Sequence, residues 1–148
     1  MDLLFEYMTF PAVGENWDDL PANEGEVEND DGDDEEPTDA AVGCTMLDRI
    51  CCAASKQKDK KALLDHVSSL VLANASHDNW GRRYASIEAL MYSAEGLNEL
   101  FAPQLGNIVP LIAQAINDPH KVVQASGIMA VSQFACDLCP VLQQNHHA

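Results

Sequence analysis

Two helix-patterned segments of similar sequence lie 41 residues apart, and this spacing dictates much of the fold. The segment 83–90 corresponds to the segment 124–131, so that Ala89 matches Ala130. A short turn containing an aspartate precedes each segment. A helical unit repeated at such a spacing cannot bury its apolar face alone, so it must stack on its neighbours. The pattern therefore predicts an all-α fold of the solenoid type.

The chain after Thr38 has helical periodicity throughout and no alternating pattern of strands. Thr38 is suited to cap the first helix, Asp78 or Asn79 the third, and Asp118 the fifth, which would begin with Pro119. The predicted helices cover about 39–55, 62–75, 80–95, 102–117 and 119–136, and a sixth begins at Pro140.

Apolar residues mark one face of each predicted helix. In the first helix Val42, Met46 and Ile50 share a face at a spacing of four, and they are expected to point toward a neighbouring helix. Pro110 is expected to kink the fourth helix. The second helix carries a stripe of five residues, Leu63, Leu64, Val67, Leu70 and Val71.

The repeat spacing falls in the range of HEAT and armadillo repeats, about 40–47 residues. We therefore expect an α-solenoid of HEAT-repeat hairpins, preceded by a disordered acidic segment. The predicted units are the remnant of a preceding helix at 1–14, an acidic disordered insertion at 15–39, a HEAT-like repeat at 40–77, a HEAT repeat at 78–118 and a partial repeat at 119–148.

Charge is strongly segregated along the chain. Residues 1–39 hold 15 of the 24 acidic residues and none of the 8 Lys and Arg, whereas the rest is nearly neutral. This composition excludes a basic nucleic-acid footprint, and no apolar run is long enough to span a membrane. A flexible polyanion attracts basic partners, although a solvated linker has the same composition. The candidate acidic tract comprises Asp30, Asp31, Asp33, Asp34, Glu35 and Glu36.

The run 79–140 resembles two successive HEAT repeats of the importin-β (karyopherin-β) nuclear transport receptors, most closely the importin five branch. The resemblance rests on Trp80 at a helix start, on the pair Glu95-Gly96, and on the Asp-Pro-His turn that begins at Asp118. It extends back through the acidic tract to the segment 46–52. One departure is Gln124, which replaces a usual arginine and weakens the Asp–Arg ladder between repeats.

The resemblance implies a binding protein rather than an enzyme. It implies part of a nuclear import receptor that binds basic protein cargo such as ribosomal proteins or histones, is regulated by Ran-GTP, contacts Phe-Gly nucleoporins, and is found in cytoplasm and nucleus. Two alternatives remain open. One is a HEAT scaffold outside transport, and the other is an acidic chaperone-like binder of basic proteins.

In importin-like solenoids the second helix of each hairpin lines the inner face, so polar residues of the predicted fourth helix are expected to lie on that face. Amide side chains can hydrogen-bond the backbone of an extended peptide, so the predicted fourth helix is a candidate for cargo binding. The alternative is that these amides are ordinary surface positions in contact with solvent. The candidate residues are Gln104, Asn107, Gln114 and Asn117.

The cysteines do not indicate a metal or catalytic site. Cys136 and Cys139 have half of a zinc-site spacing, but a structural site needs a second closed pair. Cys44, Cys51 and Cys52 lie among apolar neighbours and are expected to fill the core. No phosphate-binding loop or nucleophile motif is present. We therefore expect no catalytic residues, no metal and no cofactor.

Overall fold

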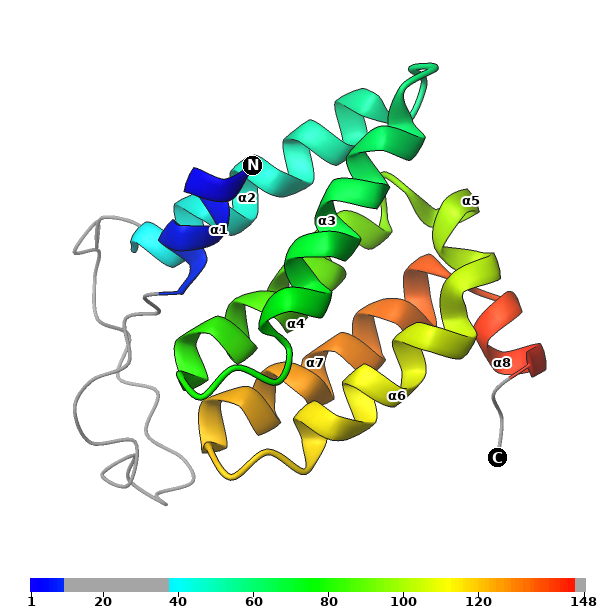
Figure 1. Cartoon of the computed structure of the whole chain (residues 1–148). Helices are drawn as coiled ribbons and strands as arrows, with labels where there is room; N and C mark the ends of the chain where they lie inside the picture. The colour runs from blue at the N-terminus through cyan, green and yellow to red at the C-terminus, as the bar shows by residue number, and fades with distance from the viewer. Residues whose placement is uncertain (10–37, 146–148) are drawn as a thin grey trace, which may run out of the picture.

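The computed structural model describes residues 1–9 and 38–145, and within these ranges the chain is helical with no strand (Figure 1). The all-α prediction is confirmed. None of the described helices is both long enough and apolar enough to cross a membrane. The elements are α1 (Asp2–Met8), α2 (Asp39–Ala54), α3 (Lys60–Asn74), α4 (Trp80–Ala94), α5 (Asn98–Phe101), the 3-10 turn η2 (Ala102–Gln104), α6 (Leu105–Ile116), α7 (Lys121–Asp137) and α8 (Val141–Asn145).

The helices form two layers. Helices α2, α4 and α7 lie side by side and run in the same direction, while α1, α3 and α6 cover them (Figure 1). Helix α3 packs mainly on α4, and α6 packs mainly on α7, so the turns near 75–79 and 117–120 lie inside tightly packed pairs. The predicted boundaries at 77/78 and 118/119 fall in these turns, and the division into repeats stays a prediction.

The helix starts follow their capping residues, with one exception. The Thr38 hydroxyl accepts a hydrogen bond from the Ala41 N–H, and the Asn79 side chain accepts one from the Gly81 N–H, as expected for N-caps. The fifth predicted helix begins later than expected, at Lys121 rather than Pro119. The prediction that Asp118 caps it is wrong, because the N-cap position falls on His120. The Asp118 carboxylate accepts from the His120 N–H in the preceding turn and from the Arg83 guanidinium.

The predicted fourth helix is divided in the structure. Its first residues form the turn η2, and the regular helix α6 begins only at Leu105 with Pro110 inside it. The residues that α6 buries are Leu105, Ile108, Ile112 and Ala115. The close approach of α7 to α6 requires Gly127, since a Cβ there would lie 2.9 Å from the Ile116 nitrogen.

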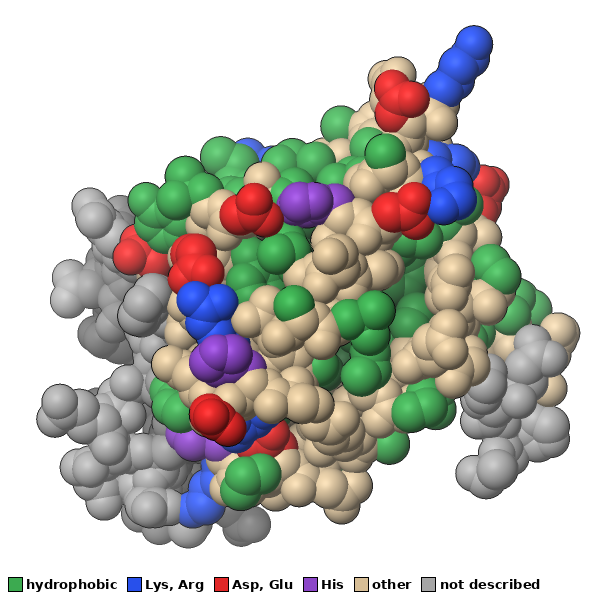
Figure 2. All heavy atoms as spheres, viewed as in Figure 1, with side chains coloured by type: hydrophobic (Ala, Val, Ile, Leu, Met, Phe, Trp, Pro, Cys, Tyr) green, Lys and Arg blue, Asp and Glu red, His purple; other side chains and the backbone are tan. Residues whose placement is uncertain are grey.

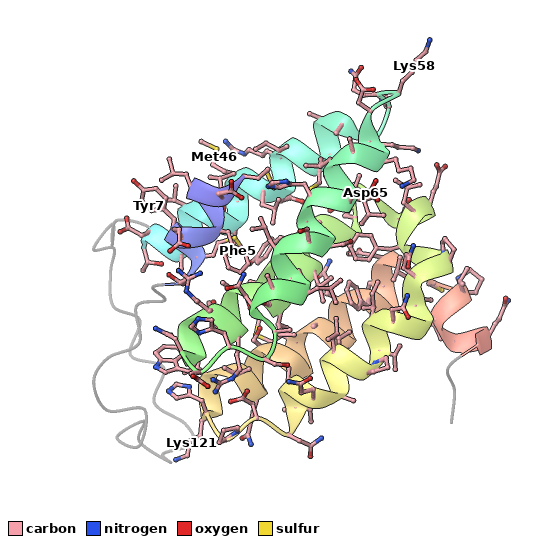
Figure 3. All side chains as sticks on the ribbon, in the orientation of Figure 1. Phe5, Tyr7, Met46, Lys58, Asp65 and Lys121 are labelled. Atoms are coloured by element: carbon pink, nitrogen blue, oxygen red, sulfur yellow. The ribbon has the colours of Figure 1, made fainter. Side chains whose placement is uncertain are left out.

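Helix α2 buries a different face from the one predicted. Its buried residues are Ala40, Gly43, Cys44, Leu47 and Cys51. Val42, Met46 and Ile50 are each 40% exposed or more, so the prediction that they face a neighbour within this chain is wrong. On the neighbouring α1, Phe5 points into the interior, whereas Tyr7 points outward (Figure 3).

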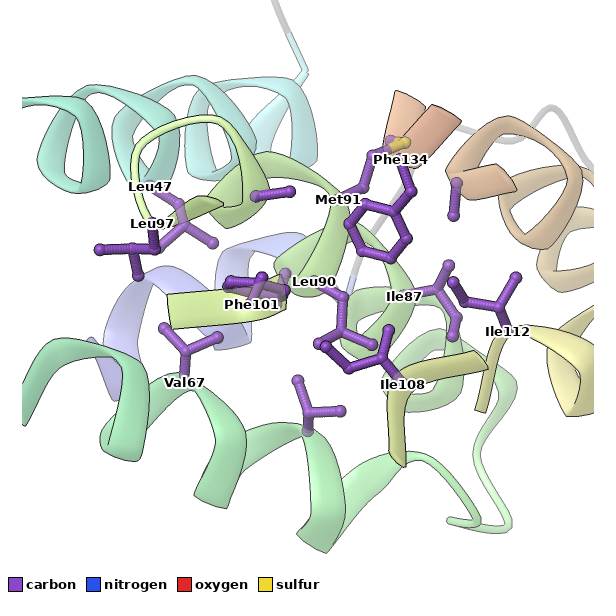
Figure 4. Packing of buried hydrophobic residues seen from close by; sticks show 14 of the residues in the cluster. Leu47, Val67, Ile87, Leu90, Met91, Leu97, Phe101, Ile108, Ile112 and Phe134 are labelled. Carbon is purple, nitrogen blue, oxygen red and sulfur yellow. The ribbon is translucent and has the colours of Figure 1, made fainter. Parts of the chain in front are cut away.

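A single apolar core lies between the two layers (Figure 4). Its largest fully buried side chains include Phe101 and Phe134, whose ring centroids are 6.0 Å apart. The predicted stripe on the second helix is confirmed, because Leu64, Val67 and Val71 are buried. Aliphatic and aromatic burial of this kind supplies most of the favourable free energy of folding.

A buried ion pair ties the start of α4 to the turn between α6 and α7. The Arg83 guanidinium donates from Nε and Nη2 to the two Asp118 oxygens, at 2.7 and 2.8 Å, and the two side chains are 14% and 5% exposed. Gln124 donates to the Asp118 carbonyl oxygen. The Asp–Arg ladder is therefore present here, with Arg83 as its basic member, while Gln124 supports the turn.

We expect Asp118→Asn to lower the free energy of unfolding by about 3 kcal/mol, because it leaves the Arg83 guanidinium without its counter-charge in a buried site. Urea unfolding measures this change. The matched control is Asp65→Asn, which breaks only an exposed i,i+4 pair with Lys61 and should cost at most about 0.5 kcal/mol. Equal losses in the two variants would contradict the assigned role of the buried pair.

The same pair should leave a signature in the pH dependence of stability. The Arg83 guanidinium beside Asp118 lowers the pKa of that carboxyl. Its stabilising contribution is therefore present above the ordinary aspartate pKa of about 4, and it is lost as pH falls through the lowered value. Urea titrations across this range should show a weaker acid dependence in Asp118→Asn than in the parent chain.

Candidate functional site

Two hollows are candidate binding sites, one on each layer. The first is a groove of about 500 Å³ between α3 and α6. The second is a cleft of about 390 Å³ across α2, α4 and α7. The groove walls are mostly aliphatic, whereas the cleft contains three carboxylates, so the two hollows suit different ligands.

The cleft lies where the C-terminal halves of three parallel helices converge. Its carboxylates are Asp48 on α2, Glu95 at the end of α4 and Asp137 at the end of α7. The other residues that line it are Met91, Tyr92, Met129, Ser132 and Gln133, so no lysine or arginine is among them. Helix C-termini carry partial negative charge, which adds to the field of the carboxylates.

The titration of neighbouring groups reports this negative field. Burial raises the pKa of the Cys52 thiol, and Asp48, Glu95 and Asp137 raise it further. Burial also raises the pKa of the Tyr92 hydroxyl, with smaller contributions from Cys44, Glu88 and, last, Asp48. The shift at Cys52 shows that additional negative charge is disfavoured beside the cleft. A cation, in contrast, would be attracted.

Carboxylate geometry in the cleft suits a cationic group. The Cys52 thiol donates to an Asp48 oxygen at 3.6 Å. The ligand atoms of Asp48, Cys52 and Glu95 all lie within 4.8 Å of one another. Two carboxylate oxygens at such a separation can both contact one ammonium or guanidinium group. The positive charge of that group would balance carboxylates that have no lysine or arginine beside them in the lining of the cleft.

The structure places two of the four predicted amides beside the groove. Gln104 and Asn107 line it, and the Asn107 amide donates to the Gln104 oxygen at 3.2 Å. Gln114 instead donates to the Ala75 carbonyl and the Ser76 hydroxyl, near the end of α3. Asn117 donates to the Ala113 carbonyl of its own helix. The structure thus brings one pair together at the groove and uses the other two amides within the fold.

Apolar side chains form most of the groove itself. It is lined by Leu64, Val71 and Leu72 from α3 and by Ile108 and Leu111 from α6. Figure 2 views the molecule from the side of α1, α3 and α6, where hydrophobic side chains are visible along the α3–α6 seam. The groove therefore offers mainly apolar contact, and its polar lining residues are Ser68, Gln104 and Asn107.

The remaining candidates are placed as follows. The acidic tract 30–36 lies outside the described residues. Cys44 and Cys51 are buried, as expected for core residues, and Cys52 is half-buried beside the cleft. Cys136 and Cys139 are exposed. The stacking of Trp80 on His120, with ring centroids 4.0 Å apart, supports a packing role for this tryptophan.

Sequence reasoning missed the carboxylates of the cleft. In the sequence Glu95 belongs only to the pair Glu95-Gly96 of the family resemblance, and neither Asp48 nor Asp137 belongs to a recognisable motif. A signal existed, because Glu95 and Asp137 lie 42 residues apart, close to the repeat spacing, and both end a helix. Residues at equivalent positions of stacked repeats lie side by side, so their charges add on one surface.

Comparisons with known proteins agree with this architecture. No protein-family model matches the sequence. The chain is 26% identical over 121 residues to importin subunit beta-3 of Saccharomyces cerevisiae, a match that covers 82% of this chain and 11% of that protein.

Solved structures show the same likeness. The crystal structure of the karyopherin Kap121p bound to the SUMO protease Ulp1p superposes with a TM-score of 0.77 at 24% identity, and it covers 99% of this chain and 13% of that one. Kap121p bound to RanGTP gives a TM-score of 0.74 at 26% identity, with 99% and 14% covered.

The chain spans less than a sixth of the length of the relatives that it matches. These relatives are transport receptors, in agreement with the expectation that the chain is not an enzyme. The HEAT-type solenoid is shared with them across nearly the whole chain. The predicted resemblance to the importin-β (karyopherin-β) nuclear transport receptors is thereby confirmed at the level of the family.

Proposed function

We propose that the acid-lined cleft binds a basic segment of a protein cargo, and that the chain acts in this way as part of a nuclear import receptor. The observation that carries this proposal is the convergence of Asp48, Glu95 and Asp137 from three helices without a lysine or arginine among the lining residues. A lysine or arginine side chain of a bound segment would satisfy these carboxylates. Met91 and Met129 would contact its aliphatic stem.

The family likeness supports the remainder of the proposal. Kap121p has been crystallised with RanGTP and with a protein, Ulp1p. By analogy, regulation by Ran-GTP, contact with Phe-Gly nucleoporins and shuttling between cytoplasm and nucleus are proposed for the receptor as a whole. Basic cargo such as ribosomal proteins or histones fits the charge of the cleft.

The amides predicted from the sequence have a secondary place in this proposal. Gln104 and Asn107 line the groove, where they can bond to the backbone of a bound segment. Gln114 and Asn117 can join them only by exchanging the bonds that they make within the fold. The cleft is therefore the principal candidate, and the groove is the second surface.

Removing the carboxylates of the cleft should weaken binding of a short Lys-rich peptide. We expect the triple variant Asp48→Asn, Glu95→Gln, Asp137→Asn to lose about 10- to 100-fold in affinity at low salt, since it removes every lining charge. Raising salt from about 50 to 200 mM should weaken the parent chain far more than the variant. Fluorescence anisotropy of a labelled peptide measures both effects.

The matched control removes three exposed acids that do not line the cleft, with Asp39→Asn, Asp59→Asn and Asp65→Asn. A small loss in the control and a large one in the cleft variant supports the proposal. Equal losses of affinity in the two variants would show that net charge, and not the cleft, determines binding of the peptide. If Gln104→Ala with Asn107→Ala weakens binding instead, the cargo site is the groove.

The acidic tract is proposed to speed the encounter with basic cargo. Replacing Asp30, Asp31, Asp33, Asp34, Glu35 and Glu36 by Asn or Gln should slow association more than it speeds dissociation, because long-range attraction acts mainly on the encounter. Stopped-flow mixing with the same peptide separates the two rates. An unchanged association rate would leave the tract as a linker, whereas binding that requires only the tract would favour the chaperone-like alternative.

The field of the cleft can also be measured without a ligand. Asp48→Asn removes one cause of the raised pKa of Cys52, so the Cys52 thiolate should be more abundant at a fixed mildly alkaline pH. We expect alkylation of Cys52 by iodoacetamide, followed by peptide mass spectrometry, to become about threefold faster. The control Asp65→Asn, on the exposed side of α3, should leave the rate unchanged, and a similar rate in both variants would argue against the field.

A further inference from the structure

Glu88 is a buried carboxyl group that the proposed binding chemistry does not use. It lies on α4, is 5% exposed, and contacts three helices. The Ser126 hydroxyl of α7 donates to its Oε1 at 2.5 Å, and the Cys44 thiol of α2 donates to its Oε2 at 3.8 Å. Tyr84, one turn earlier on α4, also helps to lower the pKa of this carboxyl, against the larger effect of burial.

These bonds lie one helical turn behind the walls of the cleft. On α2, Cys44 precedes Asp48 by four residues, and on α4 Glu88 precedes Tyr92 by four. On α7, Ser126 precedes the lining residue Met129 by three. Residues three or four apart share a helix face. Any shift of α2 or α7 that breaks these bonds therefore also moves the carboxylates that line the cleft.

Apolar packing restricts the positions of α2, α4 and α7 along their axes less strictly than hydrogen bonds do. The buried residues of α4 and α7 include small ones, such as Ala85, Ala89 and Ala130, beside larger ones such as Ile87 and Phe134. Dispersion contacts between small side chains are nearly non-directional and tolerate sliding. A buried hydrogen bond, in contrast, has a preferred length and angle, and it is costly to break where no water can replace it.

We propose that Glu88 is a positioning residue, which holds α2, α4 and α7 in register through buried hydrogen bonds and so sets the spacing of the carboxylates in the cleft. This inference rests on the proposed function of that cleft. Burial raises the pKa of Glu88, whereas the hydrogen bonds that it accepts act in the opposite direction. Glutamine has the same shape, keeps one oxygen that can accept from the Ser126 hydroxyl, and has an NH2 group that can donate to the Cys44 sulfur, whereas leucine can make neither bond.

The test compares Glu88→Gln with Glu88→Leu in binding of the Lys-rich peptide. We expect Glu88→Leu to weaken binding about tenfold and Glu88→Gln to stay within about twofold of the parent chain, because a site loosened by its supporting residues loses affinity. The control is Ser93→Ala. Ser93 is fully buried on the same helix, but it bonds only to backbone carbonyls of α4, so its loss should lower stability without changing affinity.

Hydrogen exchange separates this inference from the proposed function. Glu88→Leu should increase amide exchange in both α2 and α7, while Glu88→Gln and Ser93→Ala should not. If neither the parent chain nor any variant binds the peptide but this exchange pattern holds, the proposed function of the cleft is wrong. The proposed role of Glu88 in positioning the helices is then still supported. The positioning role of Glu88 is overturned if amide exchange is unchanged in Glu88→Leu, or if Glu88→Gln and Glu88→Leu change exchange equally.

A milder variant covers the case in which Glu88→Leu does not fold. Ser126→Ala removes only the bond from α7, so exchange should rise in α7 and not in α2, and peptide affinity should fall about threefold. Cys44→Ala should give the converse pattern, with the rise in α2. If neither variant changes exchange in its own helix, the inference is overturned.

Discussion

Helix α4 must be buried on nearly all sides, and the rest of the structure depends on this constraint. It contacts α1, α2, α3, α6 and α7, and ten of its fifteen residues are buried. Small residues such as Ala85, Ala89 and Ala94 allow its neighbours to approach closely. Its few polar side chains must therefore find partners within the fold. Arg83 does so at one end, and Glu88 does so in the middle.

The direction of the helices turns this packing into a chemical surface. Because α2, α4 and α7 run in parallel, their C-terminal ends meet on one side of the molecule (Figure 1). Acidic residues at helix C-termini are unfavourable in isolation, since they add to the negative end of each dipole. Glu95 and Asp137 occupy such positions, so the fold accepts an electrostatic cost at the place where a cationic ligand would relieve it.

Capping residues and apolar stripes, which involve residues close in sequence, predicted the helices well. They did not predict which residues far apart in sequence contact one another. The Asn79 cap and the stripe of Val67 and Val71 depend on residues close in sequence, so pattern reasoning sufficed for them. Asp118 satisfies the pattern of an N-cap equally well, but its partner Arg83 lies 35 residues away. Helix α2 carries two apolar stripes, and only contacts with α1 and α4 decide which is buried. The carboxylates of the cleft likewise become a site only when the helices stack.

The parallel layer also limits how the chain can change in length. One residue inserted between Glu88 and Glu95 would rotate the later part of α4 by about 100° and advance it by about 1.5 Å. Glu95 would then leave the cleft while Glu88 kept its partners. The turn at 55–59, in contrast, lies at an exposed tip, where added residues would not alter the register of any helix in the layer. Insertions and deletions should therefore be tolerated in this turn and be strongly selected against within the stacked helices.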